Sequence, residues 1–224
     1  MPLTVVFDLD GTLVDTAPDL IDALNVVFAR EQRRPMDYAD ARNLIGGGAR
    51  KMIEAGLKLQ GHPAKPGDVD RMFRAFVDHY SAHVADRSQP FPGLDAALDD
   101  LKARGCRFAV CTNKLEELSR QLLKVLRLTH RFDAICGPDT FRIQKPDPDF
   151  LIRTIEAANG HPRHAVMVGD SGTDIATARA AGIPIVAVDF GYSETPVAEL
   201  KPDRLISHFD QLAAAVMELA AKLS

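Results

Sequence analysis

Residues 3–12, LTVVFDLDGT, decide the fold of this 224-residue chain. Residues 3–7 are mostly apolar and rich in β-branched side chains, which is typical of a short strand buried on both faces of a parallel sheet. The apolar run stops at two acidic residues and a glycine, a combination that favours a turn. We therefore predict a buried strand whose carboxyl end presents Asp8 and Asp10.

Similar apolar runs recur along the chain, and helical patterns separate them. Strands are predicted at residues 107–111, 165–168 and 183–188, although Pro184 suits only the start or the edge of a strand. Helices are predicted at residues 94–104, 115–126, 148–158 and 174–181, with a closing helix near residues 210–223. Strands that alternate with helices predict an α/β fold with a Rossmann-like, doubly wound parallel-sheet core.

The region from residue 15 to residue 88 interrupts this alternation. It contains no convincing strand, and amphipathic patterns predict helices at residues 19–30, 40–44, 50–59 and 69–80. The chain returns to the sheet at the turn-forming sequence PFPG, residues 90–93. We therefore expect a core of residues 1–14 and 89–224, and an all-helical cap domain of residues 15–88 inserted after the first strand.

Composition and charge argue against several classes of protein. The formal net charge is −4 and no basic stripe is present, so we expect no nucleic-acid partner. No apolar run approaches the ~18 residues of a membrane span, and the first residues lack the basic segment of a secretory signal. The three cysteines show no C-x-x-C spacing and are expected to be buried free thiols. We expect a cytoplasmic protein with no membrane partner.

Residues that could do chemistry lie directly after the predicted strands or in loops beside them. Because ligands bind at the carboxyl ends of the strands in an open α/β sheet, these residues are expected to meet in one crevice. They are Asp8, Asp10, Thr112, Asn113, Lys145, Asp170 and Asp174.

The acidic residues of this set predict a metal site. Asp8, Asp10 and Asp170 would repel one another in a partly dry crevice, and a hard cation would remove that repulsion. Oxygen ligands with room for water suit Mg²⁺. The sequence therefore predicts Mg²⁺ as the cofactor.

The other residues of the set predict a site for a phosphoryl group. Thr112 and Asn113 supply neutral donors and Lys145 supplies a point charge, which are the groups that hold phosphoryl oxygens. A carboxylate nucleophile facing phosphorus is a known covalent strategy, and the metal and Lys145 would screen its repulsion from the phosphate. The expected substrate is a small phosphate ester.

The order of these motifs resembles the haloacid dehalogenase superfamily. The D-x-D-G-T motif at residues 8–12, a strand-terminal Thr112, the Lys-Pro pair at 145–146 and the G-D-x-x-x-D motif at 169–174 carry the resemblance. It covers the whole core, and the inserted helices resemble the smaller cap type of that superfamily.

The resemblance implies specific roles. Asp8 would be the nucleophile that becomes an aspartyl-phosphate, and it would also bind the metal. Asp10 would protonate the leaving alkoxide and then activate water, while its backbone carbonyl binds the metal. Asp170 would be the third metal ligand, supported by Asp174. The residues that would hold or border the phosphoryl group are Thr112, Lys145 and Asn113.

Two features of the sequence indicate which reaction of the superfamily, and which substrate, the resemblance implies. Dehalogenases of the superfamily lack the second aspartate because a halide needs no proton, so Asp10 favours phosphoryl transfer. The cap segment LIGGGAR, residues 44–50, is similar to phosphoglycolate phosphatases, as is DFGY at residues 189–192. The resemblance implies 2-phosphoglycolate as the substrate. Gly47 and Gly48 would let the backbone approach its carboxylate, and Arg50 would pair with it.

Other interpretations stay open. A sugar phosphomutase of the β-phosphoglucomutase type would share the core motifs, and a non-catalytic phosphoacceptor would use the same acidic pocket. Residues 46–48 could be a plain loop between helices, with Arg50 facing solvent. His79 and His83 have the i, i+4 spacing of zinc ligands, but without an accompanying HExxH motif a solvated helix face is the better interpretation. A monomer or a homodimer is expected.

Overall fold

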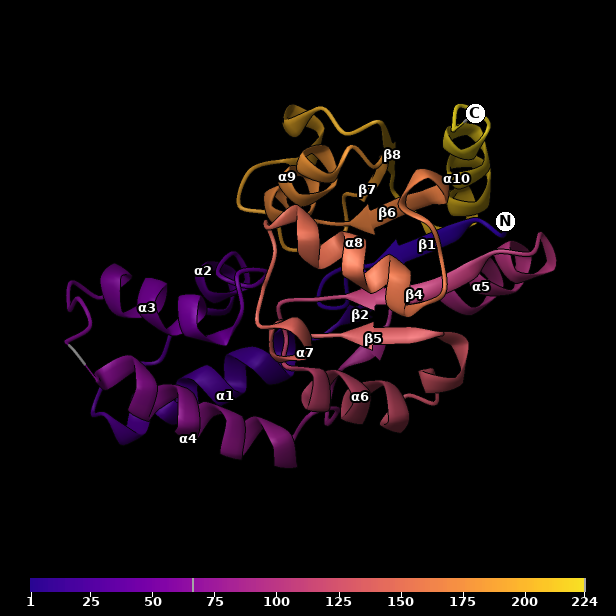
Figure 1. Ribbon diagram of the computed structural model, residues 1–224. Coiled ribbons are helices and arrows are strands. Elements are labelled where there is room, and N and C mark those ends of the chain that lie inside the picture. The colour runs from indigo at the N-terminus through magenta and orange to yellow at the C-terminus, as the bar shows by residue number, and fades with distance from the viewer. Residues whose placement is uncertain (66, 224) are drawn as a thin grey trace.

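The computed structural model of the protein describes residues 1–65 and 67–223 (Figure 1). Pro66, within the predicted cap, and Ser224, at the end of the predicted core, lie outside the described residues. Within that part of the chain, no helix is both long enough and apolar enough to cross a membrane. The three cysteines, Cys106, Cys111 and Cys136, are free and buried, as expected.

A parallel sheet of six strands within the described residues forms the centre of the protein, in the order β5-β4-β1-β6-β7-β8. The chain first extends the sheet on one side of β1 and then on the other, so the strand order reverses at β1. This confirms the predicted doubly wound α/β core. The strands are β1 (Thr4–Phe7), β4 (Arg107–Cys111), β5 (Ala134–Cys136), β6 (Ala165–Gly169), β7 (Ile185–Val188) and β8 (Arg204–Ile206).

Helices cover both faces of the sheet because its side chains alternate between two apolar cores. Val5 and Phe7 of β1 belong to the core on one face, whereas Val6 belongs to the core on the other. Helices α5 (Leu94–Ala103), α6 (Glu116–Val125) and α10 (Leu212–Ala220) contribute to the first core. Helices α8 (Pro148–Ala157) and α9 (Gly172–Ala181) contribute to the second.

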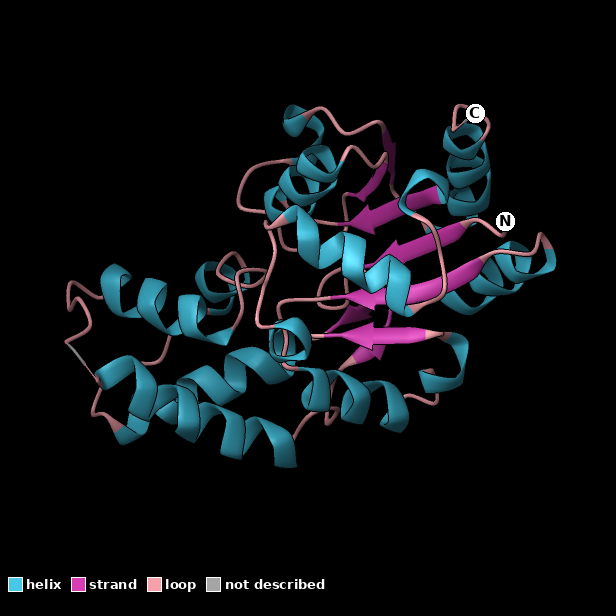
Figure 2. Cartoon of the chain, viewed as in Figure 1, coloured by secondary structure: helices cyan, strands magenta, loops and turns pink. Residues whose placement is uncertain are grey.

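The helices α1 (Ala17–Arg30), α2 (Tyr38–Arg42), α3 (Ala49–Leu59) and α4 (Asp68–Ala82) lie beyond the carboxyl ends of the strands (Figures 1 and 2). Leu24 and Phe28 of α1, with Phe76 of α4, are part of their apolar interior. The chain leaves the sheet through β2 (Val14–Asp15) and returns through β3 (Gln89–Pro90). These two short strands pair antiparallel, so the two connections lie side by side.

The structure differs from the predicted elements where the sequence signal is short. The three-residue strands β5 and β8 and the β2–β3 ribbon were not predicted, and Pro90 belongs to β3 rather than to the predicted turn. The predicted strand at 183–188 begins at Ile185, directly after Pro184, which has no N–H to donate to a ladder. The remaining short elements are α7 (Pro138–Phe141), η1 (Thr129–Arg131), η2 (Pro162–His164), η3 (Val197–Leu200) and η4 (Phe209–Gln211).

Candidate active site

The parallel register brings three motifs to one edge of the sheet. Phe7, the last residue of β1, is paired with Val110 of β4 on one side and with Val168 of β6 on the other. The strands therefore end at nearly the same level, and the residues that follow them emerge together. Asp8 leaves the central strand here, and Thr112 and Asp170 leave its two neighbours.

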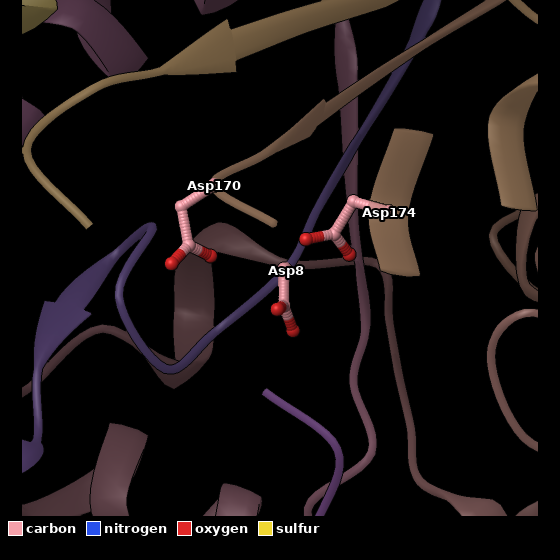
Figure 3. Close-up of side chains that lie close together, drawn as sticks. All are labelled: Asp8, Asp170 and Asp174. Atoms are coloured by element: carbon pink, nitrogen blue, oxygen red, sulfur yellow. The ribbon is translucent and has the colours of Figure 1, made fainter. Parts of the chain in front are cut away.

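Three carboxylates gather at this edge (Figure 3). One oxygen each of Asp8, Asp170 and Asp174 lies within 4.8 Å of the others. The residues are 3%, 2% and 0% exposed, so water does little to screen their charges. Buried carboxylates at this spacing are suited to share a hard divalent cation. The structure thus brings Asp8 and Asp170 together, but the third carboxylate of the group is Asp174 rather than that of Asp10, which the sequence had predicted.

Asp174 is engaged by neighbouring groups through both of its oxygens. Its Oδ1 is 2.7 Å from Lys145 Nζ, and its Oδ2 accepts hydrogen bonds from the backbone N–H and the hydroxyl of Ser171, at 3.1 and 2.6 Å. Ser171 is also the N-cap of α9, and with Asp174 it forms a capping box. Asp174 therefore holds Lys145 and the start of α9 in place, which favours a supporting role.

Lys145 is fully buried between two of the acids. Its Nζ lies 2.8 Å from Asp8 Oδ1 and 2.7 Å from Asp174 Oδ1. Burial lowers the pKa of this lysine, but the negative charges of Asp174 and Asp8 outweigh it and hold the pKa above its ordinary value. Lys145 is therefore a permanent positive charge beside Asp8.

The carboxylate cluster holds its own protons tightly when no cation is present. Burial, only partly offset by Lys145, raises the pKa of Asp8 from 3.8 to about 7. Burial and the charges of Asp174 and Asp8 raise the pKa of Asp170 well above its ordinary value. Such a cluster favours a bound cation, because the cation stabilises the charged carboxylates.

We expect the metal-free protein to lose stability as the pH rises from about 4 to about 7. In this window the native state keeps protons on Asp8 and Asp170 that the unfolded chain has already released, so raising the pH favours unfolding. The increase in Tm on adding Mg²⁺ should accordingly be larger at about pH 8 than at about pH 5. Thermal unfolding in EDTA and in Mg²⁺ at both pH values measures this. An increase in Tm on adding Mg²⁺ that is the same at both pH values would contradict the assignment of the cation site to Asp8 and Asp170.

Asp170 is held from two directions, by the loop at 189–192, which the sequence had singled out, and by Thr12 of the motif that follows β1. The backbone N–H of Tyr192 donates to Asp170 Oδ2 at 2.7 Å, and the Thr12 hydroxyl donates to Asp170 Oδ1 at 2.9 Å. The Tyr192 hydroxyl donates to Asp15 and accepts from the backbone N–H of Ala17 at 3.0 Å. Tyr192 therefore links the Asp170 carboxylate to the start of α1.

Gly11 must be a glycine for two separate reasons. Its φ is +83°, and a Cβ there would collide with Asp170 Oδ2 and lie 2.8 Å from Tyr192 Cδ2. Gly105 has the same φ of +83° but nothing within 4 Å of the Cβ position, so it provides a matched control. Alanine at either position strains the backbone, but only alanine at position 11 also collides with Asp170. Comparing the two variants therefore separates the effect of the collision from that of the strain.

Gly105→Ala should cost about 1–2 kcal/mol of unfolding free energy and leave Mg²⁺ affinity unchanged. Gly11→Ala should cost more, because Asp170 has to move, and should weaken Mg²⁺ binding by roughly 10- to 100-fold. Chemical unfolding and calorimetric Mg²⁺ titration of both variants check this. Equal Mg²⁺ affinities for the two variants would show that Asp170 does not hold the metal.

Asp10 lies apart from the acidic cluster and has its own partners. Its Oδ1 accepts a hydrogen bond from the Thr16 hydroxyl at 2.7 Å. Lys114 Nζ donates to Oδ1 at 2.8 Å and to Oδ2 at 3.1 Å. The side chain of Asp10 thus faces the cavity described below rather than the other carboxylates, which is consistent with binding a metal only through its backbone.

Lys114 is a site residue that sequence reasoning did not assign. It directly follows Thr112 and Asn113, but a lone lysine at the start of a helix is usually exposed. The structure instead buries it, at 7% exposure, with Nζ 4.6 Å from the ring centroid of Tyr80 on α4. Burial lowers its pKa, but Asp10 and Tyr80 together hold the pKa above its ordinary value. The only sequence signal was its place in the T-N-K run.

Thr112 and Asn113 are both buried at the end of β4. The Thr112 hydroxyl accepts a hydrogen bond from the Lys114 backbone N–H at 3.2 Å. The Asn113 side chain is bonded to backbone: its Oδ1 accepts from Lys145 N at 2.9 Å, and its Nδ2 donates to Lys145 O and Gly46 O at 3.2 and 3.3 Å. Asn113 therefore ties the Lys145 loop to the helical insertion, and its amide donors are engaged there.

A cavity of about 570 Å³ opens between the sheet edge and the helices α1, α3 and α4. Asp8, Asp10, Thr112 and Lys114 line it from one side, and residues 46–50 line it from the other. Most of its remaining wall is apolar, including Phe76 and Tyr80. A space of this size fits a small molecule with its phosphate at Asp8 and its remainder under the helices.

The predicted cap residues Gly47, Gly48 and Arg50 all line this cavity, but Arg50 is already paired with another residue. Gly48 packs against the backbone of Asn113, where a Cβ would lie 3.1 Å from its carbonyl oxygen, and Gly47 lies in the same lining. Arg50 also lines the cavity, but its guanidinium pairs with Asp70 and stacks 4.2 Å from the ring centroid of Phe73. Half of the Arg50 side chain is exposed, so a substrate would have to compete with Asp70 and water for it.

His79, on α4, and His83, directly after α4, do not belong to a cluster of potential metal ligands among the described residues. The rings of His79 and His83 lie tilted at 31° with centroids 4.5 Å apart, and His83 Nδ1 is 2.8 Å from Asp86 Oδ2. Within residues 1–65 and 67–223, the only grouping of three or more potential ligands is Asp8, Asp170 and Asp174. The interpretation as a solvated helix face therefore agrees with the structure.

Comparison with known proteins agrees with this geometry. Residues 5–188 match the family described as haloacid dehalogenase-like hydrolase. A phosphoglycolate phosphatase from Mesorhizobium japonicum is 47% identical over 98% of this chain and 95% of its own length. A phosphoglycolate phosphatase from Agrobacterium fabrum is 44% identical over 97% of this chain and 93% of its own length.

A solved structure shows the same arrangement of core and helices. The crystal structure of a predicted phosphoglycolate phosphatase from Haemophilus somnus superposes with a TM-score of 0.86 at 26% identity. The superposition covers 95% of this chain and 97% of that one. The similarity therefore extends across the sheet and the inserted helices alike.

Proposed function

This chain belongs to the family of haloacid dehalogenase-like hydrolases, and from that membership we propose that it is a phosphatase that hydrolyses 2-phosphoglycolate to glycolate and phosphate. The observation that carries the proposal is the buried pair of Asp8 and Lys145, 2.8 Å apart, at the edge of a cavity of small-molecule size. The full-length similarity to proteins named phosphoglycolate phosphatase supports the substrate.

The first step transfers the phosphoryl group to Asp8. A carboxylate oxygen of Asp8 forms a bond to phosphorus while the bond from phosphorus to the ester oxygen breaks. Asp10, which lines the same cavity, gives its proton to the departing alkoxide. Thr112 and Lys145 hold the phosphoryl oxygens, and the charge of Lys145 offsets the repulsion between Asp8 and the phosphate.

The second step returns Asp8 to its starting state. Asp10, now a carboxylate, takes a proton from a water molecule whose oxygen attacks phosphorus. The bond between phosphorus and Asp8 breaks, and inorganic phosphate leaves. One residue therefore serves as acid and then as base, and the hydrogen bond from Thr16 keeps its carboxyl group turned toward the cavity.

The acidic cluster fits the expected cofactor. Asp8, Asp170 and the backbone carbonyl of Asp10 would hold Mg²⁺, with Asp174 in support through Lys145 and Ser171. When bound, Mg²⁺ would neutralise the carboxylates and the phosphate oxygens. The oxygen-only donor set and the raised pKa of Asp8 support this part of the proposal.

Residues 15–88 would act as a cap over a core of residues 1–14 and 89–224. The paired β2 and β3 place both connections together, as a hinge requires, and residues 46–48 line the cavity. Closure of the cap would exclude bulk water from the phosphorylated Asp8. The contact of Arg50 with the substrate carboxylate predicted from the sequence would require Asp70 to release the guanidinium, which it holds in this structure.

The same proposal extends to the cellular setting. A formal net charge of −4 and a cavity of about 570 Å³ support a small phosphate ester as the partner rather than nucleic acid. Cytoplasmic location and a monomeric or homodimeric state complete the proposal. Size-exclusion chromatography with light scattering would test the oligomeric state.

A phosphate-release assay with Mg²⁺ tests the proposed function. The panel contains 2-phosphoglycolate, sugar phosphates and nucleotides, and kcat/KM is compared across it. We expect a clear lead for 2-phosphoglycolate. Broad, weak activity would keep the phosphatase and discard the substrate. No release would favour a sugar phosphomutase, if labelled phosphate passes from Asp8 to a sugar, or a phosphoacceptor, if the label stays on Asp8.

A further inference from the structure

Lys114 is a buried cation in the cavity to which the proposed reaction gives no task. Its side chain is only 4% exposed, and its Nζ donates to both oxygens of Asp10. Burying a lysine is costly unless the site uses its charge or pairs it well. Asp10 pairs the Lys114 charge, but the acid and base steps use only the carboxyl group of Asp10 and give the ammonium no contact with the substrate.

The other cations of the cavity region are already engaged or face solvent. Lys145 is held between Asp8 and Asp174 at the phosphoryl position. Arg50 is paired with Asp70 and half exposed, and Lys51 is exposed on the first turn of α3. Lys114 is thus the desolvated cation that faces the cavity next to the proton donor, where an ion pair with a ligand is strongest.

The connectivity of 2-phosphoglycolate fits this placement. The ester oxygen that departs from phosphorus is joined through a single methylene to the carboxylate. The group that protonates the ester oxygen and the group that binds the carboxylate must therefore be immediate neighbours. Asp10 and Lys114 are such neighbours, with 2.8 Å between Asp10 Oδ1 and Lys114 Nζ.

We propose that Lys114 recognises the carboxylate of the substrate, so that the enzyme selects phosphate esters that carry a carboxylate on the carbon next to the ester oxygen. This inference rests on the proposed function. An ammonium group carries three N–H donors, so Lys114 can bind the carboxylate and still hold Asp10. Tyr80, whose ring lies below the ammonium, fixes its position from the helical insertion, so recognition depends on core and cap together.

The test compares esters that differ only in the carboxylate. Ethyl phosphate has the same carbon chain length as 2-phosphoglycolate but ends in a methyl group. The measured quantity is the ratio of kcat/KM for 2-phosphoglycolate to that for ethyl phosphate. Any general damage to Asp10 affects both esters and cancels in this ratio. Binding without chemistry is measured as the ratio of the inhibition constant of propylphosphonate to that of 3-phosphonopropionate, which is large when the carboxylate is recognised and falls when that recognition is lost.

Three variants make the test specific. Lys114→Gln, which keeps a donor for Asp10 but loses the charge, should lower both ratios by roughly 10- to 100-fold. Lys114→Arg keeps the charge and should recover a large part of the selectivity. Arg50→Ala should change the ratios much less, because Arg50 is paired with Asp70. Thermal unfolding of each variant confirms that it is folded.

Two outcomes would overturn the inference while the proposed function stands. In the first, the ratios are unchanged in Lys114→Gln, which would leave Lys114 only as a support for Asp10. In the second, Arg50→Ala removes the selectivity and Lys114→Gln does not, which would move carboxylate recognition to the cap. If the unmodified enzyme itself shows no preference for 2-phosphoglycolate over ethyl phosphate, both the inference and the proposed substrate fail.

Discussion

Asp8→Asn is expected to abolish turnover, with kcat lower by on the order of 10⁵-fold or more. The amide nitrogen and oxygen occupy nearly the same space as the carboxylate, but the amide cannot attack phosphorus as an anionic nucleophile. Asp8 is buried with its oxygen 2.8 Å from Lys145, whereas oxygens of its two neighbours in the acidic cluster, Asp174 and Asp170, are held by other groups.

The same substitution should leave the metal-free protein at least as stable as before. The raised pKa of Asp8, about 7, means that its negative charge at higher pH opposes folding when no cation is bound. Asparagine removes that charge, while Lys145 keeps its pair with Asp174 at 2.7 Å. In EDTA at about pH 8 the Tm of Asp8→Asn should therefore not fall. The stabilisation by Mg²⁺ should shrink, because one ligand is weakened.

Phosphate release and thermal unfolding of purified Asp8→Asn measure both effects. A large loss of activity together with an unchanged or higher Tm in EDTA separates loss of the nucleophile from loss of the fold. Residual turnover within about tenfold of the unmodified enzyme would require another nucleophile. A large fall in Tm in EDTA would mean that the charge of Asp8 stabilises the native state, contrary to its position in the acidic cluster.

Asp10→Asn should lower kcat by about 10²- to 10⁴-fold, which is the contribution of a well-placed general acid or base. Asparagine can still accept the hydrogen bond from Thr16, but it can neither donate a proton to the alkoxide nor take one from water. Mg²⁺ binding should persist, because the proposed ligand at this position is the backbone carbonyl. Calorimetric Mg²⁺ titration alongside kinetics checks both expectations.

The dependence on the leaving group makes the Asp10 experiment sharper. p-Nitrophenolate leaves without a proton, so Asp10→Asn should slow phosphorylation of Asp8 much less with p-nitrophenyl phosphate than with 2-phosphoglycolate. Rapid-quench measurement of the phosphorylated enzyme resolves this step. Thr16→Val is the matched control, because it removes a hydrogen bond to Asp10 but leaves the carboxyl group. Near-normal turnover of Asp10→Asn would show that another group carries the proton.

The α/β fold and the position of the site at the strand ends could be predicted from the sequence, because the patterns that indicate them extend over only a few residues. Each long apolar run is flanked by polar residues within a few positions, and in a parallel sheet the carboxyl ends of neighbouring strands must meet at one edge. That rule alone predicted that Asp8, Thr112 and Asp170 converge, and the register of β1 with β4 and β6 agrees with it. The strands β5 and β8 were missed because three residues are too few to show a periodic pattern.

The roles of individual site residues could not be assigned from the sequence, because each role depends on which partner the side chain contacts in the folded protein. The chain suggested Arg50 as the partner of an anionic group, but Asp70, twenty residues away on the next helix, holds it in the structure. For Lys114 it offered only a place directly after Thr112 and Asn113, whereas the burial of Lys114 follows from its position between Asp10 and Tyr80, residues far apart in the sequence. Asn113 was expected at the phosphate, yet its amide is bonded to the backbone of Lys145 and Gly46.

By itself, the sequence determined the α/β class, the interruption by helices and the identity of the acidic, neutral and basic residues at the strand ends. These features follow from periodicity, turn chemistry and chain order, which act over a few residues. Only the tertiary structure decided the partners of the buried charges: Lys145 between Asp8 and Asp174, and Lys114 on Asp10. The reason is physical, because a charge removed from water must find its counter-charge in space, and distance in space is set by the packed fold rather than by position along the chain.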